Sequence, residues 1–214
     1  MAWREFYEWS GVGDYRDTIT TVFSEGFQLV SFSQPPSLLS LSLDDYASRY
    51  PDDDATGQFA DFLRQSPCAF ERSNSEAHFT GSSWLVSADG ERVLLMHHRK
   101  LGRWLQPGGH ADGDRDLARV ALREAGEETG LSDLVVEPVI FDLDRHWIPE
   151  RGQELGHWHY DVRHVVYARG SEAFVLNEES LALAWRDIRE VAGDETMDVS
   201  LRRMATRWLR RAEV

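Results

Sequence analysis

Residues 123–131 of the chain read REAGEETGL. They end a segment, Asp116–Thr129, whose apolar residues recur at helical spacing and predict a helix with one stripe facing a sheet. Glu124 and Glu128 fall inside this stripe, and Glu127 lies at its edge. Ionised carboxylates are costly to bury without compensation, so we expect a cation among them. The apolar members of the stripe are Leu117, Val120, Ala121 and Ala125.

The spacing of the three glutamates indicates a metal site. Side chains at positions i, i+3 and i+4 of a helix are neighbours, and carboxylate oxygens are the ligands that Mg²⁺ prefers. The alternative is a solvated acidic face with ion pairs such as Arg123 with Glu127. Gly130 lies two residues after the last glutamate, and glycine takes the left-handed conformation that ends a helix at low cost.

The same nine residues resemble the second half of the Nudix box, which runs Arg, Glu, apolar, any, Glu, Glu, any, Gly, apolar. Every fixed position is filled, and Gly109 lies where the box begins, in a Pro107-Gly108-Gly109 turn. The resemblance covers roughly Thr80 to Glu190. It implies an α/β fold, a Nudix-like α/β/α sandwich with a mixed sheet. It also implies an enzyme that hydrolyses a pyrophosphate bond in a nucleoside diphosphate linked to another group.

One position departs from the box. Arg115 stands where the box has its first glutamate, six residues after Gly109. Asp114 replaces that glutamate if the preceding loop is one residue short; alternatively, Asp112 or Asp114 only caps the helix. The departure leaves a second hypothesis, a non-catalytic Nudix-fold module that senses a nucleotide or regulates another process.

The resemblance also assigns roles to residues of the box. Glu124, Glu127 and Glu128 are expected to be catalytic and to hold Mg²⁺, or Mn²⁺ in its place, against the pyrophosphate oxygens. Arg123 is expected to orient the glutamates through an ion pair. The general base is Glu127 or a residue from a later loop.

Substrate contacts are predicted in the basic segment 97–104, which leads into the Pro-Gly-Gly turn. Arginine and lysine side chains bind phosphates, and a tryptophan can stack on a base. The alternative is a solvated turn with Trp104 in the core. The predicted substrate-binding residues are Arg99, Arg103, Trp104, Gly108 and Gly109, with Lys100 as a further candidate.

A second group of polar residues lies on a predicted strand. His157, His159 and Asp161 alternate along the chain and therefore share one face of the strand. Such a trio resembles a metal site that His110 or His146 would join. We favour a polar sheet face lining the substrate cleft, because the box already accounts for a metal. Glu178 and Glu179 precede a further strand, a region from which the family often draws another carboxylate.

The chain divides into three predicted parts. Residues 1–36 form an extension of unknown conformation, 37–75 a small helical cap with two short helices, and 76–214 the Nudix hydrolase domain. Strands are predicted at 83–87, 92–97, 135–144, 157–168 and 181–185. An amphipathic helix containing Met197 and Trp208 is predicted at the end of the chain, with Asp194 as its cap.

Composition limits the function classes. The net charge of -14 over 214 residues argues against an extended nucleic-acid platform, and an acidic enzyme acting on an anionic substrate would need a carboxylate-bound divalent metal to neutralise charge locally. The resemblance implies that this substrate is a small-molecule nucleotide. No apolar run is long enough to span a membrane and the first residues do not read as a signal peptide, so we predict a cytoplasmic protein. A homodimer is possible by analogy with the family. The single cysteine, Cys68, is predicted to be a packed thiol.

Overall fold

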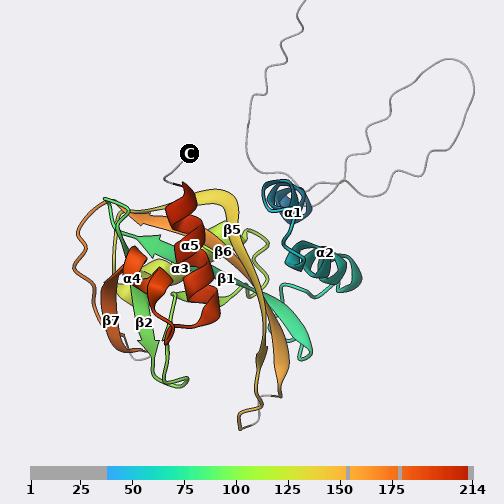
Figure 1. Ribbon diagram of the computed structural model, residues 1–214. Helices are drawn as coiled ribbons and strands as arrows, with labels where there is room; N and C mark the ends of the chain where they lie inside the picture. Colours follow the sequence, from blue (N-terminus) through green and yellow to red (C-terminus); the bar gives the residue numbers. More distant parts are fainter. Residues whose placement is uncertain (1–37, 153–154, 178–179, 212–214) are drawn as a thin grey trace, which may run out of the picture. The chain divides into compact units, whose positions relative to one another are not determined.

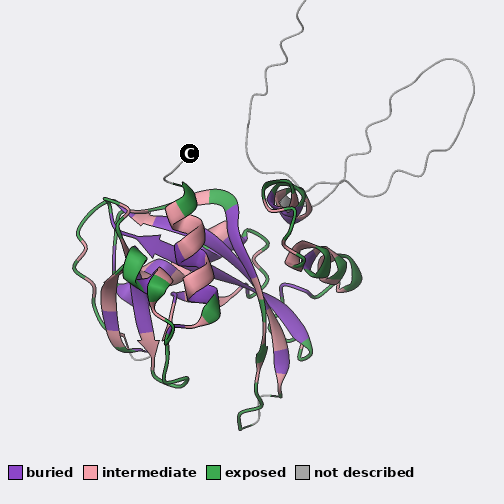
Figure 2. Ribbon diagram, in the orientation of Figure 1, coloured by how far each residue is buried: buried purple, intermediate pink, exposed green. Residues whose placement is uncertain are grey.

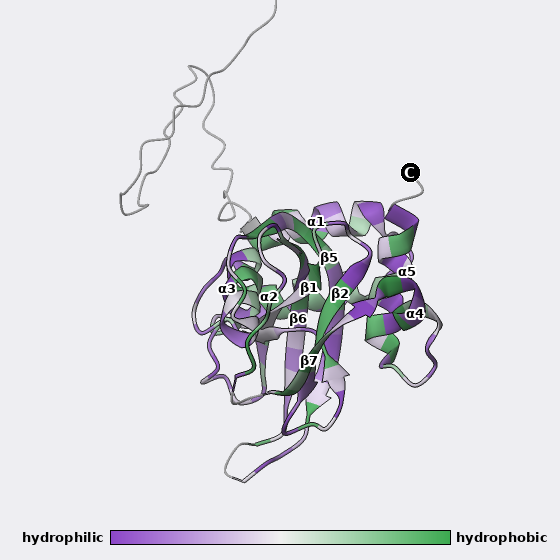
Figure 3. Ribbon diagram, turned by 90° about the vertical axis from the view of Figure 1, so that its left-hand side faces the viewer, coloured by the Kyte–Doolittle hydropathy of each residue, from purple (hydrophilic) through white to green (hydrophobic). Residues whose placement is uncertain are grey.

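The computed structural model describes residues 38–152, 155–177 and 180–211 (Figure 1). The predicted extension 1–36 lies outside these residues, as do Glu178 and Glu179. The described residues form one sheet with helices on both of its faces (Figure 3).

Within the described residues the sheet has seven strands in the order β3-β2-β1-β6-β5, with β4 paired to β1 and β7 paired to β2. β1 and β6 run parallel, and the other pairs are antiparallel. The predicted mixed sheet is therefore confirmed. The strands are β1 (Ala77–Val86), β2 (Arg92–His98), β3 (Trp104–Leu105), β4 (Gly108–His110), β5 (Leu134–Ile148), β6 (His157–Ala168) and β7 (Ser180–Asp187).

The helices lie on both faces of the sheet. α3 (Leu117–Thr129) packs on one face, while α4 (Ile188–Gly193) and α5 (Val199–Arg211) lie on the other (Figure 3). α1 (Leu38–Arg49) and α2 (Ala55–Gln65) are the two predicted short helices, and they share a core with α3. That core contains Tyr46, Phe59, Phe79 and Leu117. The α/β/α arrangement expected from the resemblance is thus present.

The strands provide most of the buried surface. All ten residues of β1 are buried, because β1 is a central strand that pairs on both sides (Figure 2). The core on the face that carries α5 is built from Trp84, Phe141, Leu201 and Met204, among others. Both faces of the sheet therefore bury apolar side chains, as a layered fold requires.

Several element boundaries differ from the predictions. β1 begins at Ala77 rather than Ser83, and β5 continues to Ile148 rather than ending at Asp144. Polar residues interrupt the apolar pattern in both extensions, so the pattern ends before the backbone pairing does. β3 and β4 lie in a segment predicted as a loop, since their strand form depends on pairing with distant strands.

The predicted cap of the last helix is wrong. α5 begins at Val199, and the carboxylate of Asp198 accepts a hydrogen bond from the Ser200 backbone N–H at 2.9 Å. Asp194 instead accepts from the backbone N–H of Thr196 in the turn after α4. Met197 precedes the helix but is still buried.

The prediction for Cys68 is also wrong, because this residue is exposed. It lies in the turn that follows α2, where its carbonyl accepts from the Glu71 N–H. The turn places the thiol at the surface. None of the helices in the described ranges is long and apolar enough to cross a membrane.

Candidate active site

The ends of α3 are fixed by local hydrogen bonds. The side chain of Asp116 accepts from the backbone N–H of Arg119 at 3.1 Å and caps the first turn. Gly130 takes the left-handed conformation, with φ 68°, and its N–H donates to the Gly126 carbonyl at 2.9 Å. The helix therefore ends at Thr129, directly before the glycine, as the position of the glycine predicted.

The three glutamates of α3 differ in exposure as the helical stripe predicted. Glu128 is 5% exposed, and its carboxylate accepts from the Gly108 backbone N–H at 2.9 Å. The side chain of Glu124 is 16% exposed, whereas Glu127 is exposed. The inner two carboxylates face the strand β4, and the outer one faces solvent.

Gly109 allows β4 to approach α3 closely. A Cβ atom added at this position would lie 2.5 Å from Cδ of Glu124, which is shorter than any real contact between such atoms. A larger residue would therefore displace the carboxylate. The glycine required by the Nudix pattern has a steric reason in this chain.

Arg123 pairs with its neighbour on α3. Its Nη2 donates to Oε1 of Glu124 at 2.8 Å and to the carbonyl oxygen of His110 at 3.0 Å. The hydrogen bond to Glu124 raises the pKa of Arg123 above its ordinary value. Arg123 thus connects the Glu124 carboxylate to the end of β4, and its role in orienting the glutamates for catalysis stays a prediction.

Asp114 and Arg115 lie at the altered box position, and each contacts a neighbouring side chain. Both oxygens of Asp114 accept from Arg119, at 2.8 and 2.6 Å, and this pairing lowers the pKa of Asp114. The guanidinium of Arg115 lies 5.1 Å from the centre of the Phe70 ring. Asp116, not Asp112 or Asp114, caps α3, so the capping alternative for those two residues is wrong.

The basic segment lies in and beside the turn between β2 and β3. Nη2 of Arg99 donates to the Ser180 carbonyl at 3.0 Å, and Arg103 pairs with Asp198 at 3.3 Å. Trp104 is partly buried and packs against the core beneath α5, which is what the alternative interpretation of this residue predicted. Substrate binding by these side chains stays a prediction.

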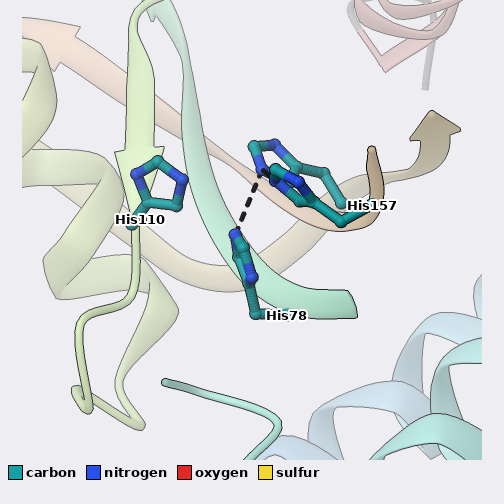
Figure 4. Close-up of side chains that lie close together, drawn as sticks. His78, His110 and His157 are labelled. Atoms are coloured by element: carbon teal, nitrogen blue, oxygen red, sulfur yellow. Dashed lines mark hydrogen bonds between the residues drawn. The ribbon is translucent and has the colours of Figure 1, made fainter. Parts of the chain in front are cut away.

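Four histidines come together on the sheet, at the ends of three strands (Figure 4). One ligand nitrogen from each lies within 4.8 Å of the others. They are His78 on β1, His110 on β4, and His157 and His159 on β6. Burial, and then the neighbouring imidazoles, lower the pKa of His159 to about 2, so this ring is neutral at physiological pH.

Asp161 does not join these histidines. Its carboxylate accepts from the hydroxyls of Thr80 and Ser82, at 2.9 and 2.7 Å, and from Nε of Arg163 at 2.7 Å. The predicted trio is therefore divided between two networks.

Sequence reasoning missed His78, which pairs with His159 across the parallel strands. The polar alternation of His78, Thr80 and Ser82 was the available signal for a strand with one polar face.

A cavity of about 700 Å³ lies away from the predicted catalytic residues. It is lined by the turn between α1 and α2 and by β5, β6 and α5, and no glutamate of α3 contributes to its wall. Its charged and aromatic lining includes Arg49, Asp53, Arg145, Trp158, Arg203 and Arg207. The residues predicted from the box do not line it.

A mixed sheet between helices, with a carboxylate-bearing helix against a Pro-Gly-Gly turn, defines a protein of the Nudix fold. Residues 79–209 match the family model of the NUDIX domain, and the chain belongs to this family.

The chain is also similar to curated and solved proteins. It is 34% identical over 113 residues to "Putative 8-oxo-dGTP diphosphatase 3" of Mycobacterium tuberculosis; the match covers 49% of this chain and 48% of that protein. The chain thus spans about half the length of this relative. A MutT protein from Methanosarcina mazei is 20% identical over 66% of this chain and 99% of its own, with a TM-score of 0.47. A Nudix-family hydrolase from Clostridium perfringens is 21% identical over 63% and 97%, with a TM-score of 0.48.

Proposed function

We propose that this chain is a Mg²⁺-dependent pyrophosphohydrolase that cleaves the P–O–P bond of a nucleoside diphosphate derivative. The observation that carries the proposal is the set of three carboxylates on α3, two of which are held in place. The Gly108 N–H holds Glu128, and Arg123 holds Glu124. Burying an ionised glutamate costs free energy, so a helix with only a structural role would not be expected to carry one at this position.

The donor set of α3 fits a hard divalent cation. Glu124, Glu127 and Glu128 offer only oxygen ligands, which suit Mg²⁺ and also Mn²⁺. When bound, the ion would supply positive charge at the pyrophosphate and acidify the attacking water. The protein's own part is to hold the carboxylates in position, which the Gly108 N–H and Arg123 do.

The exposures of the glutamates suggest different tasks. Glu128 is buried and bonded to the backbone, so it acts as a fixed ligand. Glu127 is exposed and remains our candidate for the general base that takes a proton from water. In the proposed hydrolysis, the water oxygen bonds to one phosphorus, the bridging P–O bond breaks, and two phosphate-containing products form.

The test is turnover by the purified chain with Mg²⁺ on a panel of nucleoside diphosphate derivatives. The named relative makes 8-oxo-dGTP the first substrate to try, followed by ordinary nucleoside triphosphates, dinucleotide polyphosphates, nucleotide sugars and ADP-ribose. We expect at least one compound to yield a nucleoside monophosphate. Unchanged turnover in a Glu127→Gln, Glu128→Gln double variant would refute the site.

The alternative is a nucleotide-sensing module that does not hydrolyse its ligand. It is favoured by Arg115 at the first box position and by Asp114, whose carboxylate is paired with Arg119. This alternative predicts that a nucleotide raises the melting temperature in the presence of Mg²⁺ while no product forms. We also expect a cytoplasmic protein whose partners are small nucleotides, acting alone or as a homodimer.

A further inference from the structure

A second set of ligand-type side chains lies outside the glutamate site. His78, His110, His157 and His159 come from three strands, yet one ring nitrogen of each falls within 4.8 Å of the rest. Figure 4 shows the rings of His78, His110 and His157 turned toward a common centre. His78 and His157 are buried, and the other two are half-buried.

Backbone carbonyls fix the tautomer of two of these rings. Nδ1 of His78 lies 3.1 Å from the Asn74 oxygen, and Nδ1 of His157 lies 2.8 Å from the Leu155 oxygen. A carbonyl oxygen only accepts, so each Nδ1 carries a proton, and in the neutral form of the ring each Nε2 carries a lone pair. Metal-binding histidines are oriented by the same kind of outer hydrogen bond.

The lone pairs of these two rings converge on a third ring. Nε2 of His159 lies 3.1 Å from Nε2 of His78 and 3.0 Å from Nε2 of His157. A neutral imidazole carries one N–H, so His159 has a single proton to offer two acceptors. Hydrogen bonding alone therefore satisfies this group poorly.

A metal ion would satisfy all three nitrogens. Zinc binds imidazole nitrogen at about 2.0–2.1 Å in tetrahedral geometry, which places neighbouring ligand nitrogens about 3.3 Å apart. The two distances from Nε2 of His159 are within a few tenths of an ångström of that value, and all four ligand nitrogens lie within 4.8 Å of one another. Rotations of the rings that widen the two short distances and shorten the longer ones would admit the ion, with His110 as the fourth ligand.

We propose that His78, His110, His157 and His159 bind one late first-row divalent transition-metal ion, with Zn²⁺ as the best fit. Four imidazole nitrogens suit Zn²⁺, and they suit Mg²⁺ poorly because it prefers oxygen. The two metal sites of the chain are thus chemically distinct. Four protein ligands leave no open position, so the proposed ion is structural.

The proposed ion would connect β1, β4 and β6. His110 is one residue from Gly109 and two from Gly108, the glycines that contact Glu124 and Glu128. Fixing the end of β4 would therefore also fix the turn that positions the glutamates. The loss of the ion should lower thermal stability, since a ligand that binds only the folded state stabilises it.

The test is a titration of the chelator-treated 214-residue chain with Co²⁺ and Zn²⁺. Four-coordinate Co²⁺ absorbs visible light far more strongly than six-coordinate Co²⁺, so the spectrum reports the geometry of the site. We expect one equivalent of Co²⁺ to give the intense spectrum, one equivalent of Zn²⁺ to displace it, and the melting temperature to rise.

Three variants separate this site from the glutamate site. His159→Gln should weaken Zn²⁺ binding at least about a hundredfold, since even outer-shell changes cost about 10–100-fold. His97 lies on β2 and is not one of the four histidines, so the His97→Gln variant should bind Zn²⁺ as tightly as the original chain does. Combined Glu124→Gln, Glu127→Gln and Glu128→Gln should abolish hydrolysis and keep the cobalt spectrum.

The half-buried His110 provides a second test if His159→Gln does not fold, as judged by circular dichroism. His110→Ala should also lose the four-coordinate spectrum. The proposal is overturned by a weak six-coordinate spectrum, by no binding to the original chain, by unchanged affinity in a folded histidine variant, or by loss of the spectrum in the glutamate variant. None of these results depends on the chain being a hydrolase.

Discussion

Gly109 and Glu124 illustrate how a single residue shapes the candidate site. The glycine leaves room for the carboxylate, and Arg123 holds that carboxylate by a hydrogen bond of 2.8 Å. The neighbouring Gly108 contributes its backbone N–H to Glu128. Two glycines and one arginine thus position two acidic groups, which explains why the turn and the helix form one motif.

The replacement Gly109→Ala tests this contact. The new methyl group would displace the Glu124 carboxylate, and a displacement of about 1 Å in an active site can cost about 10²-fold in rate. We expect kcat to fall by about that factor on whichever substrate the panel identifies, measured by product formation. A variant that is folded by circular dichroism and keeps full activity would contradict the steric role of Gly109.

At the scale of the element, α3 is the part of the structure that the sequence determines most directly. Its cap, its apolar stripe and its terminal glycine are all local in sequence, so a pattern of residues is enough to predict them. The same holds for the hairpin of β1 and β2 and for the apolar face of α5.

Other features of the site depend on strand pairing between distant residues. His78 meets His159 because β1 and β6 run parallel in one register, and no local pattern reveals that register. The separation of Asp161 from the histidines has the same origin, since its partners Thr80 and Ser82 come from β1. These contacts are visible only once the sheet is assembled.

A glycine inside α3 and the glycine that follows it provide a matched pair for stability. Gly126 lies inside the helix with space for a Cβ atom, so Gly126→Ala should raise the free energy of unfolding by about 0.5–1 kcal/mol. Gly130 has φ 68°, and a Cβ atom there would lie 3.0 Å from Val175, so Gly130→Ala should lower it by about 1–2 kcal/mol. Urea denaturation measures both values, and equal effects would contradict the assigned helix end.

At the scale of the whole molecule, a buried ionic network joins the sheet to its surrounding helices. Asp142 on β5 has no exposed surface and accepts from Arg163 on β6 and from Arg203 and Arg207 on α5. Arg207 also bonds Asp53 in the turn between α1 and α2. The network therefore links four parts of the fold around one carboxylate.

Removing this central charge should be costly. Asp142→Asn would leave three guanidinium groups with fewer acidic partners, and breaking a buried ion pair costs about 3–5 kcal/mol. The exposed pair of Asp45 and Arg49 serves as the control, because Asp45→Asn should cost less than about 1 kcal/mol. Chemical denaturation compares them, and similar losses in both variants would show that the buried network contributes little.

The same network predicts how stability responds to acid. Burial alone would raise the pKa of Asp144, but hydrogen bonds from His146 and Arg203 and the charge of Arg163 lower it well below its ordinary value of 3.8. A carboxyl whose pKa is lowered by folding stabilises the folded state above its unfolded pKa and loses that contribution as pH falls through the folded pKa.

We therefore expect the free energy of unfolding to decrease as pH falls below about 4, because Asp144 is protonated in the unfolded chain while it stays ionised in the folded one. Urea denaturation at pH 6 and at pH 3 measures the change. An Asp144→Asn variant should show a smaller decrease than the original chain. An equal decrease in both proteins would assign the acid sensitivity to other groups.

The central claim is that the carboxylates of α3 perform pyrophosphate hydrolysis. It is tested most directly by the rate of substrate hydrolysis, with saturating Mg²⁺, of Glu128→Gln beside Glu190→Gln, an exposed glutamate on α4. We predict that Glu128→Gln loses at least about 10²-fold in kcat, because a misplaced active-site group costs that much, while Glu190→Gln retains the original rate. Equal rates for the two folded variants would contradict the assignment of the active site to α3.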